Sequence, residues 1–390
     1  MNFLEHIVLN PKIKLKKGEV YPFVEMANVS TNNREPDMIE NRVYTSGVKF
    51  EEYDTVIARI EPCLQNGKKF LAKGIKQGFG STEYLVFRPM DDMVDAVFLY
   101  YFMQTDYIRK SMIGSMTGST GRQRVNNDIF KTLDIEVPNI EVQRKIAKIL
   151  SAYDDLIENN KKQIKLLEEM AQCLYKEWFL DLHFPGYEEV EIVDGVPEGW
   201  SRKKISDFGE IITGKTPSTS RQEYYGGNIP FVKIPDMHNG VYPIITEATL
   251  TIEGANTQKS KFIPRNSILV SCIATVGLVN IAVESCQTNQ QINSIVLENL
   301  EDLYYVYSTM KRLKALLQGV GSNGATMTNV NKTKFGNLEV LYPDNSLRKA
   351  YYDFCEPIFR KIYDLSISST KLVQARDGLC SKCMSGELEV

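Results

Sequence analysis

The chain has 390 residues, of which 43% are hydrophobic, and its formal net charge is -3 at pH 7. This length predicts two or three domains with real cores. The slightly acidic balance excludes a protein that coats polyanions over its whole surface, but it allows local basic loops. Seven scattered cysteines, no signal peptide and no membrane-spanning apolar run lead us to expect a cytoplasmic protein with reduced thiols and no membrane partner.

The first domain is expected over residues 1–140, with mixed α/β character. Short β-rich runs, at Thr55–Ile60 and Glu83–Phe87, are separated by loops that contain Gly and Asn. A helical segment follows near Ala96–Met112. A final strand at Leu133–Val137 then leads into a long helix.

The central segment Glu141–Leu182 contains no Pro or Gly and has an apolar residue every three or four positions. We expect one long helix over residues 141–183. The stripe of apolar side chains along this helix is wide enough to pack against more than one neighbouring element. An isolated helix of this length needs a packing partner to be stable. Asn160 either fixes the register of a helix pair or lies at a solvated turn. The heptad a positions, with Trp178 beside them at an e position, are Ile146, Tyr153, Asn160, Leu167 and Leu174.

The second half of the chain repeats the first, which places a linker and a second domain at residues 184–344. The first domain lacks a counterpart to most of Trp200–Tyr225. The matched segments are Tyr21–Asn28 with Ile229–Asp236, Asp54–Ala58 with Asn266–Val270, Gly67–Ala72 with Gly277–Ala282, and Ser81–Phe87 with Gln291–Leu297.

A second long helix is expected at residues 345–390, because the repeat spacing of 205 residues carries the central a positions onto apolar residues there. These residues are Tyr351, Ile358, Leu365, Leu372 and Leu379. The predicted fold is α+β: two similar mixed α/β domains separated by two long helices. The helices are expected to pack as an antiparallel coiled coil with a pseudo-two-fold internal repeat.

No catalytic or metal site stands out. Residues Gly209–Thr216 match the phosphate-binding pattern G-x-x-x-x-G-K-[ST], but the preceding segment is polar and Pro217 follows, so a nucleotide hydrolase using Lys215 is disfavoured. Cys380 and Cys383 lack a second ligand pair, and their helical spacing favours buried packing over zinc.

Several loops have the chemistry of base readout, because Arg matches the guanine edge and Asn or Gln the adenine edge. One such loop alone is usually an ordinary turn, but loops at matched positions in both repeats favour DNA contact. The candidates are Asn32, Asn33, Arg34, Arg59, Asn66, Lys68, Arg122, Gln123, Arg124, Asn126, Lys215, His238, Asn239, Asn289, Gln290, Asn323, Thr326 and Thr328.

The order of domains and helices, together with three motifs, resembles the specificity subunits of type I restriction-modification systems. Leu167–Phe179 is similar to the family's central conserved region, and Leu379–Leu388 to its C-terminal ending. Gly214–Pro217 followed by Ile229–Val232 resembles the opening of a target recognition domain. The C-terminal ending departs from the family at Cys380, Ser381 and Cys383.

This resemblance implies a non-catalytic subunit without a cofactor, in which each recognition domain reads one half of a bipartite site in double-stranded DNA. The helix pair would set the gap and dock two methyltransferase subunits, which bring S-adenosylmethionine and methylate adenine N6. Restriction/translocase subunits would use ATP and magnesium. The residues alone leave open a coiled-coil adaptor that does not recognise a DNA sequence.

Overall fold

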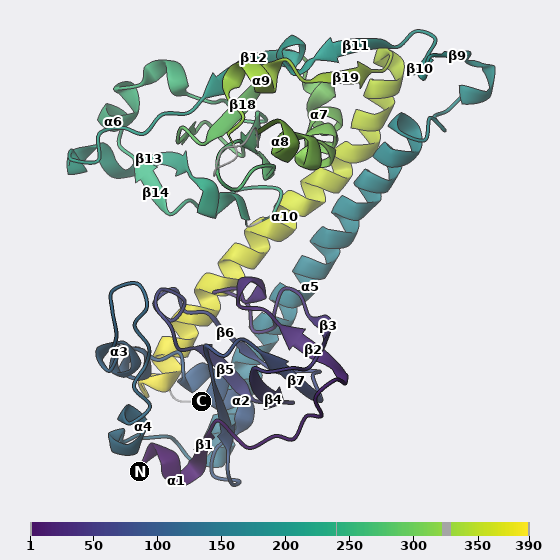
Figure 1. The fold of residues 1–390 in the computed structure, drawn as a ribbon. Helices are drawn as coiled ribbons and strands as arrows, with labels where there is room; N and C mark the ends of the chain where they lie inside the picture. The colour runs from purple at the N-terminus through teal and green to yellow at the C-terminus, as the bar shows by residue number, and fades with distance from the viewer. Residues whose placement is uncertain (1, 239, 322–328, 389–390) are drawn as a thin grey trace. The chain divides into compact units, whose positions relative to one another are not determined.

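The computed structural model describes residues 2–238, 240–321 and 329–388. They form two compact units, each of which combines one globular domain with part of both long helices (Figure 1). Unit 1 comprises Met1–Asn160 and Ser369–Val390, and unit 2 comprises Lys161–Ser368. Among the described residues, no helix is long and apolar enough to cross a membrane.

Unit 1 contains two four-stranded sheets with small helices around them. The first sheet has the order β1 (Ile7–Leu9), β8 (Tyr84–Pro89), β5 (Thr55–Ala58), β6 (Lys69–Leu71). The second has the order β3 (Glu40–Val43), β2 (Val20–Val24), β7 (Gln77–Gly80), β4 (Val48–Glu51). The α-helices of its globular part are α1 (Phe3–His6), α2 (Ala96–Phe102), α3 (Asp106–Gly114) and α4 (Ile129–Thr132).

Unit 2 has a matching first sheet, a second sheet of three strands instead of four, and two small additional strand pairs. Its first sheet has the order β12 (Gly209–Thr213), β18 (Ile292–Leu297), β15 (Ile268–Ser271), β16 (Val279–Ile281). Its second has the order β14 (Ala248–Leu250), β13 (Tyr225–Val232), β17 (Gln287–Thr288). The additions are the pairs β9 (Ile192–Val193) with β10 (Val196–Pro197) and β11 (Ser201–Lys204) with β19 (Glu339–Tyr342).

Short helices connect these strands. The α-helices in the globular part of unit 2 are α6 (Ile252–Asn256), α7 (Leu303–Arg312), α8 (Lys314–Gly321) and α9 (Lys332–Gly336). The 3-10 helices of the two units are η1 (Met26–Asn28), η2 (Tyr187–Glu189), η3 (Ile205–Phe208), η4 (Gln222–Tyr224), η5 (Ile234–His238), η6 (Lys259–Lys261) and η7 (Leu300–Asp302).

The internal repeat is present in the strand pairing, because β2 pairs β3 antiparallel and β7 parallel, as β13 pairs β14 and β17. The predicted alignment of β5 with β15 is wrong by one residue. Tyr53 donates to the Ala72 carbonyl as Asn266 does to Ala282, and both donors have positive φ, 65° and 64°. Tyr53 therefore corresponds to Asn266.

The predicted strand at Leu133–Val137 does not form. In unit 2 the corresponding β19 pairs with four residues of β11, whereas in unit 1 a single bridge between Asn2 and Asp134 takes the place of that ladder. Without a partner strand, the backbone of this segment cannot satisfy its hydrogen-bonding groups as a strand does. Strand β12, which lies within Trp200–Tyr225, does have a counterpart in unit 1, namely β1. The part of Trp200–Tyr225 without a counterpart in the first domain is therefore smaller than predicted.

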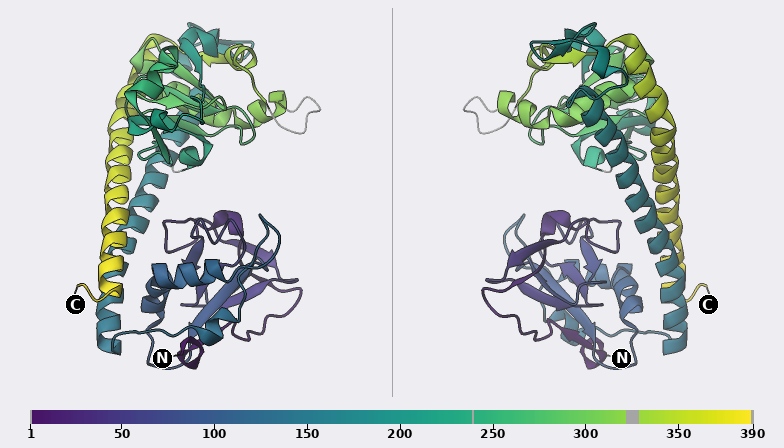
Figure 2. Two further views of the ribbon diagram at one scale, coloured as in Figure 1. Left: turned by 90° about the vertical axis from the view of Figure 1, so that its left-hand side faces the viewer. Right: turned by 90° about the vertical axis from the view of Figure 1, so that its right-hand side faces the viewer.

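The two long helices are α5 (Ile140–Phe179) and α10 (Asn345–Met384), each of 40 residues. They lie side by side within each unit (Figure 2). In unit 1, Asn160 Nδ2 donates to Ser369 Oγ at 3.2 Å, and Asp154 meets Arg376 further along. These contacts run antiparallel. Asn160 is buried and bonded across the pair, which favours the register role over a solvated turn.

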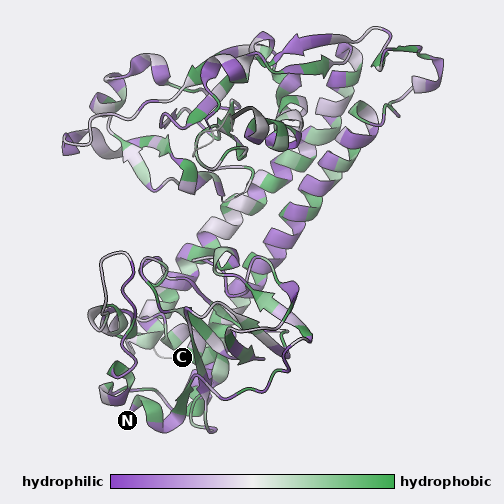
Figure 3. Cartoon of the chain, viewed as in Figure 1, coloured by the Kyte–Doolittle hydropathy of each residue, from purple (hydrophilic) through white to green (hydrophobic). Residues whose placement is uncertain are grey.

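Each domain core continues onto its part of the helix pair. In unit 2, Tyr351 of α10 donates to the Ala171 carbonyl of α5 at 3.0 Å, beside the rings of Tyr175, Phe179 and Tyr305. In unit 1, Ile146 and Leu150 pack into the same cluster as Cys383, and Cys380 packs against it. The predicted buried packing of Cys380 and Cys383 is thus confirmed. Apolar colour concentrates on the central strands and the inner helix faces (Figure 3).

Candidate nucleic-acid interface

The loop 117–126 of unit 1 is held as a short hairpin whose tip is exposed. Thr117 and Arg124 exchange backbone hydrogen bonds of 2.9 and 3.0 Å. Val125 N donates to the Arg59 carbonyl at 3.0 Å, which ties the hairpin to the end of β5. Gly121 N donates to Glu61 Oε2 at 2.9 Å, and the positive φ of Gly121, 79°, suits glycine. The hairpin therefore presents Arg122 on a fixed backbone.

The three arginines of this hairpin region differ in how free they are. Arg124 forms a fork with Glu83, with Nη2 to Oε1 at 2.7 Å and Nε to Oε2 at 2.9 Å. Its hydrogen bond lowers the pKa of Glu83. Arg59 is half-buried and donates to the Val125 carbonyl at 3.2 Å. Arg122 is exposed, and its guanidinium has no partner among the residues that the structure describes, so it is the most available cation.

Two of the predicted DNA contacts have a structural role instead. The guanidinium of Arg34 is 2% exposed, and it donates to Glu158 at 2.7 and 3.1 Å and to Asp155 at 2.6 Å. Asn33 is buried and donates to Asp37 at 2.7 Å. Arg34 joins the first domain to α5 inside unit 1, whereas Asn33 bonds within its own loop region. Burial and these bonds do not fit the predicted role of Arg34 and Asn33 in DNA contact.

The charge cluster around Arg34 contains three carboxylates, of Glu35, Asp155 and Glu158, and a second cation, Lys73. Burial, together with a smaller contribution from the neighbouring Glu35, raises the pKa of Glu158 to about 7 against the effect of Arg34. The excess of one carboxylate over the cations gives the physical reason for a retained proton.

The other unit 1 candidates are placed at the surface. Asn32 and Asn66 are exposed, and Gln123 is half-buried. Lys68 is half-buried and donates to the Met26 carbonyl at 2.7 Å. Asn126 is exposed and accepts from the Asp128 backbone at 3.0 Å.

In unit 2, two predicted segments come together. Lys215 N donates to the Thr288 carbonyl at 2.9 Å, and Thr216 donates to Gln290 Oε1 at 2.7 Å. Gly214 permits this approach, because a Cβ there would lie 2.2 Å from the Asn289 carbonyl oxygen. The side chains of Lys215 and Gln290 are exposed.

The remaining unit 2 candidates lie apart from that contact or outside the described residues. Asn289 is buried and donates to Gln291 at 2.9 Å, so its amide points inward and does not fit a role in base contact. His238 is exposed at the end of η5. The candidates outside the described residues are Asn239, Asn323, Thr326 and Thr328.

The structure rules out the phosphate-loop geometry at Gly209–Thr216. The first five residues of this pattern form β12, and no α-helix begins directly after Thr216. The next described helix is η4, a single 3-10 turn. A working loop opens directly into a helix. Across residues 2–238, 240–321 and 329–388, no group of three or more His, Cys, Asp or Glu side chains is arranged so that it could hold a metal ion.

Sequence reasoning missed the acidic partners of the hairpin. Glu83 and Glu61 set the positions of Arg124 and Gly121, yet both are ordinary residues in the sequence. The only sequence signal for the position of Glu83 is that it lies just before strand β8. That signal does not identify the arginine that the carboxylate binds.

Comparison with known proteins supplies the family. The model of the type I restriction modification DNA specificity domain matches residues 8–169 and 197–365. The HindI specificity subunit of Haemophilus influenzae is 33% identical over 79% of this chain and 81% of its own length. The MjaIX specificity subunit of Methanocaldococcus jannaschii is 28% identical over 77% of this chain and 71% of its own length.

A solved structure shares the fold. The type I restriction-modification S subunit of M. genitalium superposes with a TM-score of 0.54 at 14% identity, covering 98% of this chain and 95% of the other. With its two matched domains, the chain belongs to the type I restriction-modification DNA specificity family. It is a DNA specificity subunit and not one of the enzymes of such a system.

Proposed function

We propose that each globular domain reads one half of a bipartite DNA target. The observation that carries this proposal is the repeated strand order of the first sheet, with an isolated β-bridge to a polar residue at the same strand end in both domains. Ile60 bridges Arg124 in unit 1, and Ile273 bridges Asn329 in unit 2. Two similar domains with different side chains at equivalent positions suit an asymmetric target of two unlike halves.

Within unit 1, Arg122 is the first candidate for base contact. An exposed guanidinium on a fixed backbone can meet the O6 and N7 atoms of guanine. Arg124 can contact DNA only if its guanidinium shares or gives up its two hydrogen bonds to Glu83. In unit 2, Lys215 is proposed to contact a DNA phosphate. Its ammonium carries a charge, but it cannot form the paired hydrogen bonds by which an arginine distinguishes a base.

The helix pair is proposed to pack as a coiled coil, to set the gap between half-sites and to dock two methyltransferase subunits. Exposed apolar side chains on α5 support the docking: Ile149 and Leu156 in unit 1, and Leu166 and Met170 in unit 2, with exposed fractions of 37–64%. Soluble surfaces leave such rows open mainly where a partner covers them. The predicted a positions are buried or half-buried instead, so they serve the helix pair and the domain cores.

The complex that follows includes double-stranded DNA, methyltransferase subunits and restriction/translocase subunits. In this proposal the cofactors, S-adenosylmethionine, ATP and magnesium, belong to those subunits. The alternative of an adaptor without sequence recognition predicts methylation, if any, without a defined target.

The experiment is to express the complete system and map methylated adenines across the host genome. The proposal expects one motif with two specific halves and a fixed gap. Inserting one heptad into each of α5 and α10 would add about 10 Å of helix and widen the gap by about three base pairs at roughly 3.4 Å each. Methylation without a motif would support the adaptor, and an unchanged gap would remove the spacer role.

A further inference from the structure

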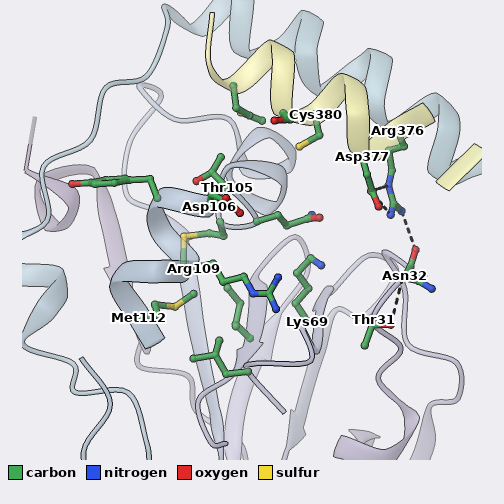
Figure 4. A pocket seen from close by; sticks show the side chains of 18 of the residues that line it. Thr31, Asn32, Lys69, Thr105, Asp106, Arg109, Met112, Arg376, Asp377 and Cys380 are labelled. Carbon is green, nitrogen blue, oxygen red and sulfur yellow. Dashed lines mark hydrogen bonds and ion pairs between the residues drawn. The ribbon is translucent and has the colours of Figure 1, made fainter. Parts of the chain in front are cut away.

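Unit 1 contains a cavity of about 660 Å³ beneath the last turns of α10 (Figure 4). Its walls come from the loop at Asn32, strand β6, helix α3 and the α10 residues around Cys380. The volume lies within the range of small-molecule sites, which is roughly 300–1,000 Å³.

The cavity has an excess of positive charge. Among the described residues, the ammonium of Lys69 has no hydrogen-bond or ion-pair partner, and the guanidinium of Arg109 donates only to the Gln65 carbonyl. The other lining charges are neutralised. Arg376 binds Asp377 at 2.7 Å and also binds Asp154. Asp106 binds Lys110 at 2.9 Å. Two cations therefore face the cavity without counter-ions.

Burial and the nearby guanidiniums of Arg376 and Arg109 lower the pKa of Lys69 to about 8. The two cations form an incomplete polar site, because no carboxylate among the described residues lies within ion-pair distance of either.

Part of the lining is apolar, and four of its apolar residues are buried: Ile57, Leu64, Met103 and Met112. They lie among polar lining residues such as Asn32, Asn66 and Gln104. A ligand that suits this mixed lining carries an anionic group and an apolar or planar body.

The second domain closes the corresponding space. Lys69 pairs with Ile57 in the sheet as Val279 pairs with Val270, and Val279 is a buried core residue. By the helix repeat, Cys380 corresponds to Tyr175 and Met384 to Phe179, whose rings fill the core of unit 2. The cavity is therefore a particular feature of the first domain and not a consequence of the fold.

We propose that this cavity binds a small phosphate monoester of nucleotide size. Two unpaired cations match the charge of about -2 that a phosphate monoester carries near neutral pH. The phosphate contacts Lys69 and Arg109, and the body of the ligand packs on the apolar lining residues. The volume suits a molecule of nucleotide size, and Lys69 lies on strand β6 beneath the last turns of α10 (Figure 4), which favours a free small molecule over duplex DNA.

Isothermal titration of the full chain with AMP, inorganic phosphate and adenosine tests the proposal. AMP binding is expected, with adenosine at least about 10-fold weaker. Lys69→Met and Arg109→Gln should each weaken AMP by about 10- to 100-fold, because a charge-assisted hydrogen bond is lost. Lys76→Met, an exposed lysine of the same domain outside the cavity, should bind AMP like the parent.

Four outcomes overturn it: no saturable AMP binding, unchanged affinity in both cavity variants, equal affinity for adenosine, or displacement of AMP by short duplex DNA. The last would assign the cations to the DNA interface. Lys69→Met conserves the apolar stem and places an apolar residue where the other repeat has valine. Arg109 is exposed, so its variant keeps the test valid if Lys69→Met folds poorly.

Discussion

The ion pair between Asp154 and Arg376 joins α5 and α10 within unit 1 and is almost fully buried. Asp154 is 1% exposed and Arg376 is 5% exposed, and their Oδ1 and Nη1 atoms lie 2.5 Å apart. Tyr101 also donates to Asp154. Arg376→Met removes the cation and leaves a buried carboxylate with the tyrosine hydroxyl as its remaining side-chain donor. Breaking a buried pair in this way costs about 3–5 kcal/mol.

The double variant Asp154→Asn with Arg376→Met should lose less, about 1–2 kcal/mol, because no charge remains buried and the amide oxygen still accepts from Tyr101. Arg42→Met is the matched control: it breaks an ion pair on β3 whose arginine is 42% exposed, and should cost less than about 1 kcal/mol.

Native-state hydrogen exchange measures these changes separately in each unit. In hydrogen exchange, the amides of α2 report on unit 1. In a separate measurement, the fluorescence of both tryptophans, Trp178 and Trp200, reports on unit 2. A loss below about 1 kcal/mol for Arg376→Met, or a larger loss for the double variant than for the single one, would refute the reasoning.

Four further predictions follow from named contacts. The folded-state pKa of Glu158 is raised to about 7, so folded unit 1 holds an extra proton, and its stability should fall by up to about 3 kcal/mol as the pH rises from about 4.5 to 7. Glu158→Gln should flatten this pH dependence in hydrogen exchange, and an unchanged slope would assign the dependence to other groups. Tyr351→Phe removes the bonds to Ala171 and Ser308 and should destabilise unit 2 by about 1–2 kcal/mol in urea unfolding followed by tryptophan fluorescence, with no change if the hydroxyl is dispensable. Leu156→Asp should prevent co-purification with the methyltransferase subunit, whereas the neighbouring exposed Asn159→Asp should not; equal binding by both would place docking elsewhere. Arg122→Ala should cost about 1–3 kcal/mol of discrimination at one base pair of one half-site, and uniform weakening on all duplexes would instead mean a phosphate contact.

The sequence predicted the long helices and the repeat because their evidence is periodic and extends over many residues. Ile146 and Tyr351 occupy equivalent buried positions, as the heptad register required. The exact strand register was not predictable to the residue. Every residue of β5 and of β15 is buried, so no alternation of polar and apolar residues marks which face each side chain occupies.

The site residues were harder to predict because long-range partners decide their roles. Arg34 lies in a polar loop with Asn32 and Asn33, which is typical of base readout, yet Glu158 of α5 binds it across 124 positions of sequence. Lys69 lies in a segment that already matched the second repeat. Its pairing with an apolar counterpart, Val279, was the available signal for the cavity.

The most direct test of the central claim is to exchange residues 1–140 for the first domain of another family member and map methylated adenines in cells that carry the complete system. The account predicts that one half of the target changes, while the other half and the gap stay the same. A change in both halves, or in the gap, would contradict the assignment of one half-site to each domain.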